Sequence, residues 1–147
     1  MACCGSRQWV NRMLGRLPFG SREALLSAAR DEWFALSEDD WREAFAHHPK
    51  IGDARALRTR FAATRHLSER EQAGVAGAPD AIVEALAEGN RAYQEKFGFI
   101  FIVCASGRTA EEMLALLRTR LQNSPTAEIQ IAAEEHAQIT ARRLEAL

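Results

Sequence analysis

Three short polar motifs could together place proton-transferring and substrate-holding groups in one site. The motifs are His48-Pro49-Lys50-Ile51-Gly52, Ser68-Glu69-Arg70-Glu71-Gln72, and Asn90-Arg91-Ala92-Tyr93 continuing to Lys96-Phe97-Gly98. A histidine near its ordinary pKa can give or take a proton close to pH 7. A side-chain amide can donate and accept hydrogen bonds without titrating. A histidine, a glutamate and an amide can therefore form a proton-handling site that needs no metal and no cofactor.

His48 is the first candidate for a catalytic group. The residue before a proline avoids helical ψ, so Pro49 ends the preceding helix and leaves His48 on an irregular segment. A side chain on such a segment can point into a cleft. The alternative is that His48 only lies at a helix C-terminus, where a positive charge is favoured. The residues alone leave both interpretations open.

Ser68, Glu71 and Gln72 are candidates for binding a polar substrate. Ser68 and Glu71 also fit a capping box, in which the serine caps a helix and the glutamate reaches back to its start. The two interpretations are compatible, because free N–H groups at a helix N-terminus together with a carboxylate and an amide could hold a polar molecule.

Arg143 is the candidate for binding an anionic group. In the last predicted helix Ile129, His136 and Arg143 are spaced by seven residues, so they share nearly one face. An arginine on a core-facing stripe needs an anionic partner, and a guanidinium pairs well with a carboxylate. The alternative is a salt bridge to an acidic residue of this chain, and Arg120 is the competing candidate for the binding role. We interpret His136 as a satisfied core histidine rather than a catalytic one.

The third motif is typical of core packing. Tyr93 and Phe97 are four residues apart and therefore lie on one face of a helix. Asn90 is slightly unfavourable in a helix interior, so we expect its side chain to form a hydrogen bond.

Helix signals follow one another closely along the chain. We expect helices over residues 21–36, 37–47, 53–64, 79–98 and 124–147, one that begins at Thr109, and a short one from Ser68. The apolar run 99–105 is strand-like but has no partner strand, so we expect a buried irregular connector. The predicted fold is all-α, a single-domain bundle of about seven helices over residues 19–147. Residues 1–18 are expected to form a loosely ordered N-terminal segment.

The composition is that of a soluble globular protein. The 147 residues are 47% apolar and 27% charged, and the net charge is −1 with both signs interspersed. No basic stripe indicates nucleic acid or an anionic membrane as a partner, and no apolar run is long enough to cross a bilayer. Three cysteines without metal-ligand spacing, and no signal-peptide pattern, suit a reducing cytoplasm. We therefore expect a cytoplasmic protein without a bound metal.

Together these stretches resemble the 2-oxo-4-hydroxy-4-carboxy-5-ureidoimidazoline (OHCU) decarboxylase family, the last enzymes of the route from urate to allantoin. The matching features are His48-Pro49-x-Ile51-Gly52, Ser68-x-x-Glu71-Gln72-Ala73-Gly74, Asn90-x-x-Tyr93-x-x-Lys96-Phe97-Gly98-Phe99 and Phe101-Ile102-Val103. A more generic tail follows, with Arg120-Leu121-x-Asn123, Glu128-Ile129 and Arg143-Leu144. The likeness extends from residue 19 to the last residue.

The resemblance implies an all-helical fold, usually a homodimer, and a cofactor-free decarboxylation that gives (S)-allantoin. It places the family's catalytic histidine at His48 and its catalytic glutamate at Glu71. The substrate-binding positions that it implies are Pro49, Ser68, Gln72, the backbone near Val103, and Arg143.

Two other functions can be weighed against this one. The first is a non-catalytic helical module that binds a small anionic metabolite, although the presence of His48, Glu71 and Gln72 argues against it. The second is a metal enzyme that uses the four histidines, none of which has the i, i+4 spacing to another that helical metal sites favour.

Overall fold

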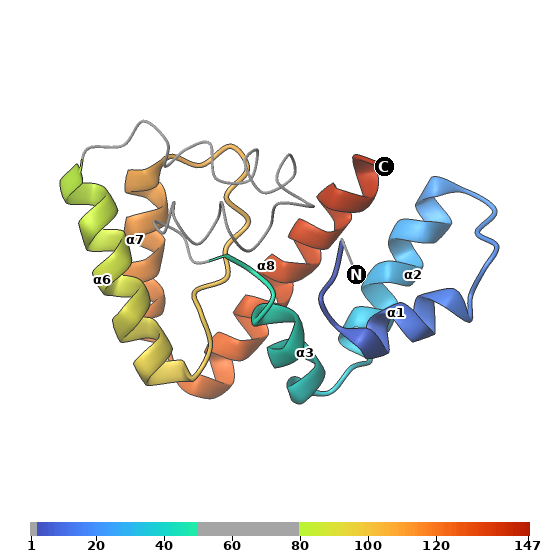
Figure 1. The fold of residues 1–147 in the computed structure, drawn as a ribbon, viewed down its shortest axis with the longest axis horizontal. Coiled ribbons are helices and arrows are strands. Elements are labelled where there is room, and N and C mark those ends of the chain that lie inside the picture. Colours follow the sequence, from blue (N-terminus) through green and yellow to red (C-terminus); the bar gives the residue numbers. More distant parts are fainter. Residues whose placement is uncertain (1–2, 50–79) are drawn as a thin grey trace.

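The computed structural model describes residues 3–49 and 80–147, which form six α-helices and no strand (Figure 1). The helices are α1 (Arg7–Leu14), α2 (Arg22–Phe34), α3 (Glu38–Phe45), α6 (Asp80–Phe97), α7 (Ala110–Arg120) and α8 (Pro125–Glu145). The predicted all-α class is confirmed. The helices expected over 53–64 and from Ser68 lie outside the described residues.

Polar caps start the helices where local sequence signals predict them. Four of the predicted helices follow a Ser or Thr whose side-chain oxygen accepts an N–H of the first turn, namely Ser21, Ser37, Thr109 and Ser124. In α3 and α7 an acidic side chain also reaches back to the cap, which completes a capping box. Gly98 ends α6 with φ of 77°, a left-handed conformation that glycine adopts without steric cost.

Part of the N-terminal segment 1–18 is a helix rather than a loose chain. Residues 7–14 form α1, which Ser6 caps, and Trp9 and Met13 are buried on its inner face. The Nε1–H of Trp9 donates to the Ala29 carbonyl of α2 at 2.9 Å. A helix of eight residues is not stable by itself in water. Its tertiary contacts with α2 therefore order it, and the sequence pattern did not reveal them.

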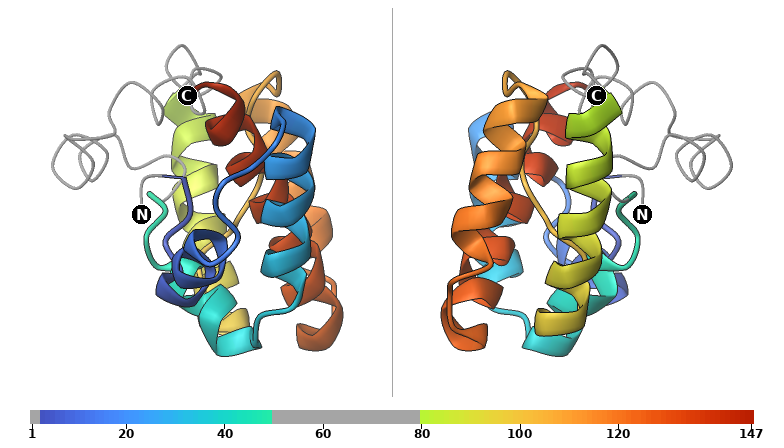
Figure 2. Two further views of the ribbon diagram at one scale, coloured as in Figure 1. Left: turned by 90° about the vertical axis from the view of Figure 1, so that its right-hand side faces the viewer. Right: turned by 90° about the vertical axis from the view of Figure 1, so that its left-hand side faces the viewer.

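The helices form two groups joined by α8. Figures 1 and 2 show α6 and α7 side by side at one end of the molecule and α1 and α2 at the other. Helix α8 packs against α2, α3 and α6, so its buried face runs through the core. Trp33 of α2 ties two of these elements together, because its Nε1–H donates to the Ala133 carbonyl of α8 at 2.9 Å.

The segment between α6 and α7 is a buried connector without regular structure, as predicted. All seven residues from Phe99 to Ala105 are buried. In Figure 1 this segment runs back from the end of α6 to the start of α7. The connector therefore lies inside the molecule, between the α6–α7 pair and α8. Among the described helices, none has both the length and the apolar character needed to cross a bilayer.

Candidate active site

Two adjacent histidines follow α3, and their side chains take different environments. His47 is exposed, and its Nδ1 lies 2.9 Å from the Glu43 carbonyl in the last turn of the helix. His48 donates its main-chain N–H to the Phe45 carbonyl at 3.1 Å, and its side chain is buried. The helix C-terminal role considered for His48 therefore belongs to His47.

The imidazole of His48 packs against the imidazole of His136 in α8. The ring centroids are 4.9 Å apart and the planes meet at 77°, an edge-to-face contact. His136 is completely buried and stacks on the indole of Trp33, with centroids 4.1 Å apart. Helices α2 and α8 thus fix the surface on which His48 rests.

Burial keeps both histidines neutral. Burial, then the neighbouring His136 and the positive charge of Arg143, lower the pKa of His48 well below its ordinary value of 6.5. Burial and the charge of Arg143 lower the pKa of His136 to about 3. At neutral pH His48 therefore carries an unprotonated ring nitrogen, which is the form that a general base requires.

The Nε2 atoms of this pair of histidines have no hydrogen-bond partner within residues 3–49 and 80–147. On the other side of the ring, His136 Nδ1 lies 3.4 Å from the Thr140 hydroxyl oxygen. The interpretation of His136 as a core histidine agrees with its burial, but only one of its two nitrogens has a partner in this part of the chain. Its contact with His48 was not expected from the sequence.

Arg143 approaches the same two histidines from the last turns of α8. Its side chain is half-buried, and its charge is near enough to lower the pKa of both His48 and His136. The helical face predicted from the seven-residue spacing is confirmed, because Ile129 and His136 are buried on α8. The structure therefore brings His48 and Arg143 into one region.

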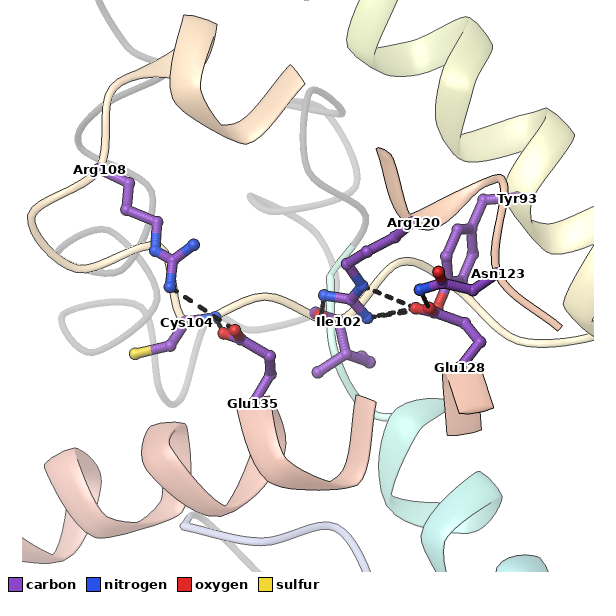
Figure 3. Close-up of polar contacts among 8 residues, drawn as sticks. All are labelled: Tyr93, Ile102, Cys104, Arg108, Arg120, Asn123, Glu128 and Glu135. Carbon is purple, nitrogen blue, oxygen red and sulfur yellow. Dashed lines mark hydrogen bonds and ion pairs between the residues drawn. The ribbon is translucent and has the colours of Figure 1, made fainter. Parts of the chain in front are cut away.

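Arg120, the competing arginine, belongs to a separate buried ion pair (Figure 3). Its Nε and Nη2 lie 2.7 and 2.6 Å from Glu128 Oε1, and the two side chains are 6% and 0% exposed. Its Nη1 donates to the Ile102 carbonyl at 2.7 Å. Arg120 thus fits the alternative considered for a core arginine, a salt bridge within its own chain.

Tyr93 and Asn123 complete the contacts of this ion pair. The Tyr93 hydroxyl donates to Glu128 Oε1, and Asn123 Nδ2 donates to Glu128 Oε2 at 2.8 Å. Burial raises the pKa of Tyr93 above its ordinary value, so the hydroxyl keeps its proton and remains a donor. Every side chain in this network has a partner for its charge or its hydrogen bonds.

The third sequence motif supports packing, as predicted. The rings of Tyr93 and Phe97 lie 4.6 Å apart between centroids, and both residues are buried. The side chain of Asn90 donates from Nδ2 to the Leu86 carbonyl of its own helix at 2.9 Å. Asn90 and Tyr93 of this motif thus contribute to the packing and hydrogen bonding of α6.

Of the remaining predicted site residues, two lie within the described ranges and three lie outside them. Pro49 and Val103 are both buried, the first directly after His48 and the second within the connector. Ser68, Glu71 and Gln72 lie outside the described residues, so their position relative to His48 stays a prediction. In the part of the chain with described coordinates, no three His, Cys, Asp or Glu side chains are grouped so that they could hold a metal ion.

Comparison with known proteins identifies the family. A family model described as OHCU decarboxylase matches residues 1–145. The chain is 44% identical over 145 residues to the uric acid degradation bifunctional protein TTL of Arabidopsis thaliana, which covers 97% of this chain and 44% of that protein. It is 34% identical over 98 residues to the 2-oxo-4-hydroxy-4-carboxy-5-ureidoimidazoline decarboxylase of Amia calva, which covers 67% of this chain and 55% of that protein. The chain thus spans about half the length of these two relatives.

A similar fold is present in a crystal structure of OHCU decarboxylase in the presence of (S)-allantoin. The TM-score is 0.82 at 37% sequence identity, and the match covers 98% of this chain and 92% of that chain. Three observations indicate the same family: the polar motifs, the match to the family model and the similarity of the fold. The chain belongs to the OHCU decarboxylase family.

Proposed function

We propose that this protein decarboxylates OHCU to (S)-allantoin without a cofactor. The observation that carries the proposal is a buried, neutral His48 beside the positive charge of Arg143, in a chain of this family. Two relatives add support. The Arabidopsis protein is named for uric acid degradation, and the similar solved structure was obtained in the presence of (S)-allantoin.

The reaction suits side chains of this kind. Loss of CO2 leaves an electron pair on a ring carbon of the substrate, and the adjacent C=N bond can take up that pair. The substrate is therefore its own electron sink. The protein has to orient the carboxylate, stabilise the developing anion and deliver one proton to one face of the ring.

We assign the proton transfer to His48, whose neutral ring can accept or relay a proton. Glu71 forms hydrogen bonds with the ring hydroxyl of the substrate and with its neighbouring atoms, as the resemblance implies. Gln72 and Arg143 hold the ureido and anionic groups. Ser68, Pro49 and the main chain of Val103 complete the binding site.

Arg143 is a better candidate than Arg120 for the substrate carboxylate. Arg120 is already paired with Glu128 and with a connector carbonyl, so a substrate would have to displace a buried ion pair. Arg143 lies beside the histidine that we assign to catalysis. A guanidinium at that position can bind the carboxylate through two parallel hydrogen bonds, in a bidentate geometry.

We also propose that the protein acts as a homodimer in the cytoplasm, on a small-molecule substrate and with neither nucleic acid nor membrane as a partner. The support is the family resemblance, the balanced charge and the three free thiols. Light scattering after size exclusion measures the assembly directly. A monomer at micromolar concentration would contradict the dimer without affecting the assignment of the reaction.

The experiment that tests the activity generates OHCU in situ by oxidation and hydrolysis of urate and follows circular dichroism. Rapid appearance of optically active allantoin on adding the protein supports the proposal. Slow racemic decay at the uncatalysed rate contradicts it. That result would favour the alternative, a non-catalytic helical module that binds a small anionic metabolite.

A further inference from the structure

Two hydrogen bonds hold the main chain on either side of Val103, within the buried connector (Figure 3). Arg120 of α7 donates from Nη1 to the Ile102 carbonyl at 2.7 Å. The N–H of Cys104 donates to Oε2 of Glu135, on α8, at 2.6 Å. The partners come from two different helices, so the connector is fixed between them at this point.

These two bonds also set the directions of the main-chain groups of Val103. A peptide group is planar, and the peptides here are trans, so its N–H and C=O point in opposite directions. The bond from Arg120 to the Ile102 carbonyl therefore turns the Val103 N–H away from Arg120. The bond from Cys104 to Glu135 likewise turns the Val103 carbonyl away from Glu135.

The two main-chain groups of Val103 are not used by the hydrogen bonds that hold the connector. Within the described ranges, no hydrogen bond involves the N–H or the carbonyl of Val103. One donor and one acceptor are thus presented by a segment that α7 and α8 hold in place. A ureido or ring-amide group carries the complementary acceptor and donor.

Glu135 is itself held at a second point. Its Oε1 lies 3.6 Å from Nη2 of Arg108, which follows the connector. The main-chain N–H of Arg108 closes a turn by donating to the Ala105 carbonyl at 3.0 Å. Glu135 also directly precedes His136, so a single turn of α8 fixes both the connector and the surface under His48.

We propose that Glu135 is a positioning residue, which orients the peptide groups of Val103 for the amide-like part of the substrate by accepting the Cys104 N–H. The inference rests on the proposed function, in which the Val103 main chain binds OHCU. Loss of this bond loosens binding in the ground state and the transition state alike, because no proton is transferred here. The effect therefore falls on KM rather than on kcat.

Three variants separate this role from general structural support. Glu135→Ala removes the acceptor, Glu135→Gln keeps an oxygen that can accept the Cys104 N–H, and Arg108→Gln removes only the partly exposed ion pair. We expect Glu135→Ala to raise KM about 10- to 100-fold with kcat nearly unchanged, since a hydrogen bond to a charged group is lost. We expect the other two variants to stay within about threefold of the wild-type KM.

Amide hydrogen exchange at Cys104, measured without substrate, provides a second readout. Exchange should be faster in Glu135→Ala and close to the wild-type rate in Glu135→Gln. Unchanged exchange in Glu135→Ala, or an active Glu135→Ala enzyme with the wild-type KM, would overturn the inference. A parallel fall of kcat and melting temperature in all three variants would also overturn it, because it would indicate structural support alone.

Failure of the proposed function gives a different result. A wild-type protein that does not accelerate OHCU decay would remove the proposed function, and the substrate role of Val103 with it, at any exchange rate. A different result would be an active wild-type enzyme together with a Glu135→Ala variant of unchanged KM. That result would overturn only the positioning role of Glu135.

Discussion

Two buried polar clusters in this fold differ in whether their polar atoms are paired. The arginine network, formed by Tyr93, Arg120, Asn123 and Glu128, pairs its buried charges and bonds them further to neutral groups. The histidine pair, His48 and His136, keeps an Nε2 on each ring without a partner in the described residues. A buried polar atom without a hydrogen bond costs about 1–3 kcal/mol, so such atoms are uncommon.

The difference distinguishes a network whose groups are paired from the histidine pair that we assign to the proposed active site. A network that is internally paired stabilises the packing of α6, α7 and α8 but leaves no group for a substrate. A neutral imidazole whose Nε2 has no partner among the described residues is less favourable for folding, but it keeps an atom that can accept a hydrogen bond or a proton from a bound molecule.

Replacing His48 by Asn should have the largest effect, and on activity rather than stability. Asn can form hydrogen bonds but cannot transfer a proton, so we expect decarboxylation to fall about 10²- to 10⁴-fold. The rate is measured by circular dichroism with OHCU generated in situ, and thermal unfolding of the same sample checks the fold. Wild-type turnover by a folded His48→Asn protein would show that His48 is not the catalytic group.

Replacing Arg120 by Met should mainly reduce stability. The substitution leaves the buried carboxylate of Glu128 without its cation, and we expect a loss of about 3–5 kcal/mol in the free energy of unfolding. Urea denaturation measures this difference. Arg118→Met, at an exposed position of the same helix, is the matched control and should change stability by less than about 0.5 kcal/mol. Equal losses in both variants would mean that the arginine network does not stabilise the fold.

Acid should destabilise the protein through the histidine pair. The folded-state pKa of His136 is about 3, below the unfolded value near 6.5, so the unfolded chain binds a proton that the folded chain excludes. The stability that neutral His136 gives to the folded state is therefore fully present above pH 6.5 and is lost as the pH falls below it. Between pH 7.5 and pH 5 we expect His136 to lower the free energy of unfolding by roughly 2 kcal/mol.

His48 acts in the same direction, because its pKa is also lowered by burial. Urea denaturation at both pH values measures the combined loss, and His136→Gln should reduce it. A His136→Gln variant with the full wild-type pH dependence would show that His136 is not held neutral in the folded state.

Removing an exposed ion pair should have the smallest effect on the free energy of unfolding. Comparison with Arg120 then shows how burial changes the cost of losing one ion-pair partner. Arg30 of α2 and Glu134 of α8 form two hydrogen bonds of 2.9 and 3.0 Å, with 55% and 44% of their side chains exposed. Solvent screens such a pair, so Arg30→Gln should lower stability by at most about 1 kcal/mol. The difference should shrink further in high salt. A loss as large as that of Arg120→Met would contradict the distinction between exposed and buried pairs.

Helix limits could be predicted because their signals are local. Ser21, Ser37, Thr109 and Ser124 each bond to an N–H within one turn, so a few adjacent residues contain the whole interaction. Helix α1 has a local cap as well, at Ser6, but its eight residues are too few to be stable alone. Its order depends on the burial of Trp9 and Met13 against residues distant in sequence.

The site could be predicted in part for the same reason. Pro49 is a local signal that singles out His48, and the seven-residue spacing in α8 places His136 and Arg143 on one face. The contact between His48 and His136 depends on how α3 and α8 pack, which no local pattern specifies. Arg120 and Arg143 both lie on largely apolar helix faces. Only the position of Glu128 in the folded chain assigns Arg120 to a structural pair.

The stacking of Trp33 on His136 gives the protein an intrinsic optical reporter. The indole lies 4.1 Å from the imidazole between ring centroids, and that imidazole contacts His48. A protonated imidazole quenches indole fluorescence more strongly than a neutral one does. Trp33 emission should therefore respond to events at His48, and replacing Trp9 and Trp41 by Phe would isolate that signal for stopped-flow measurement.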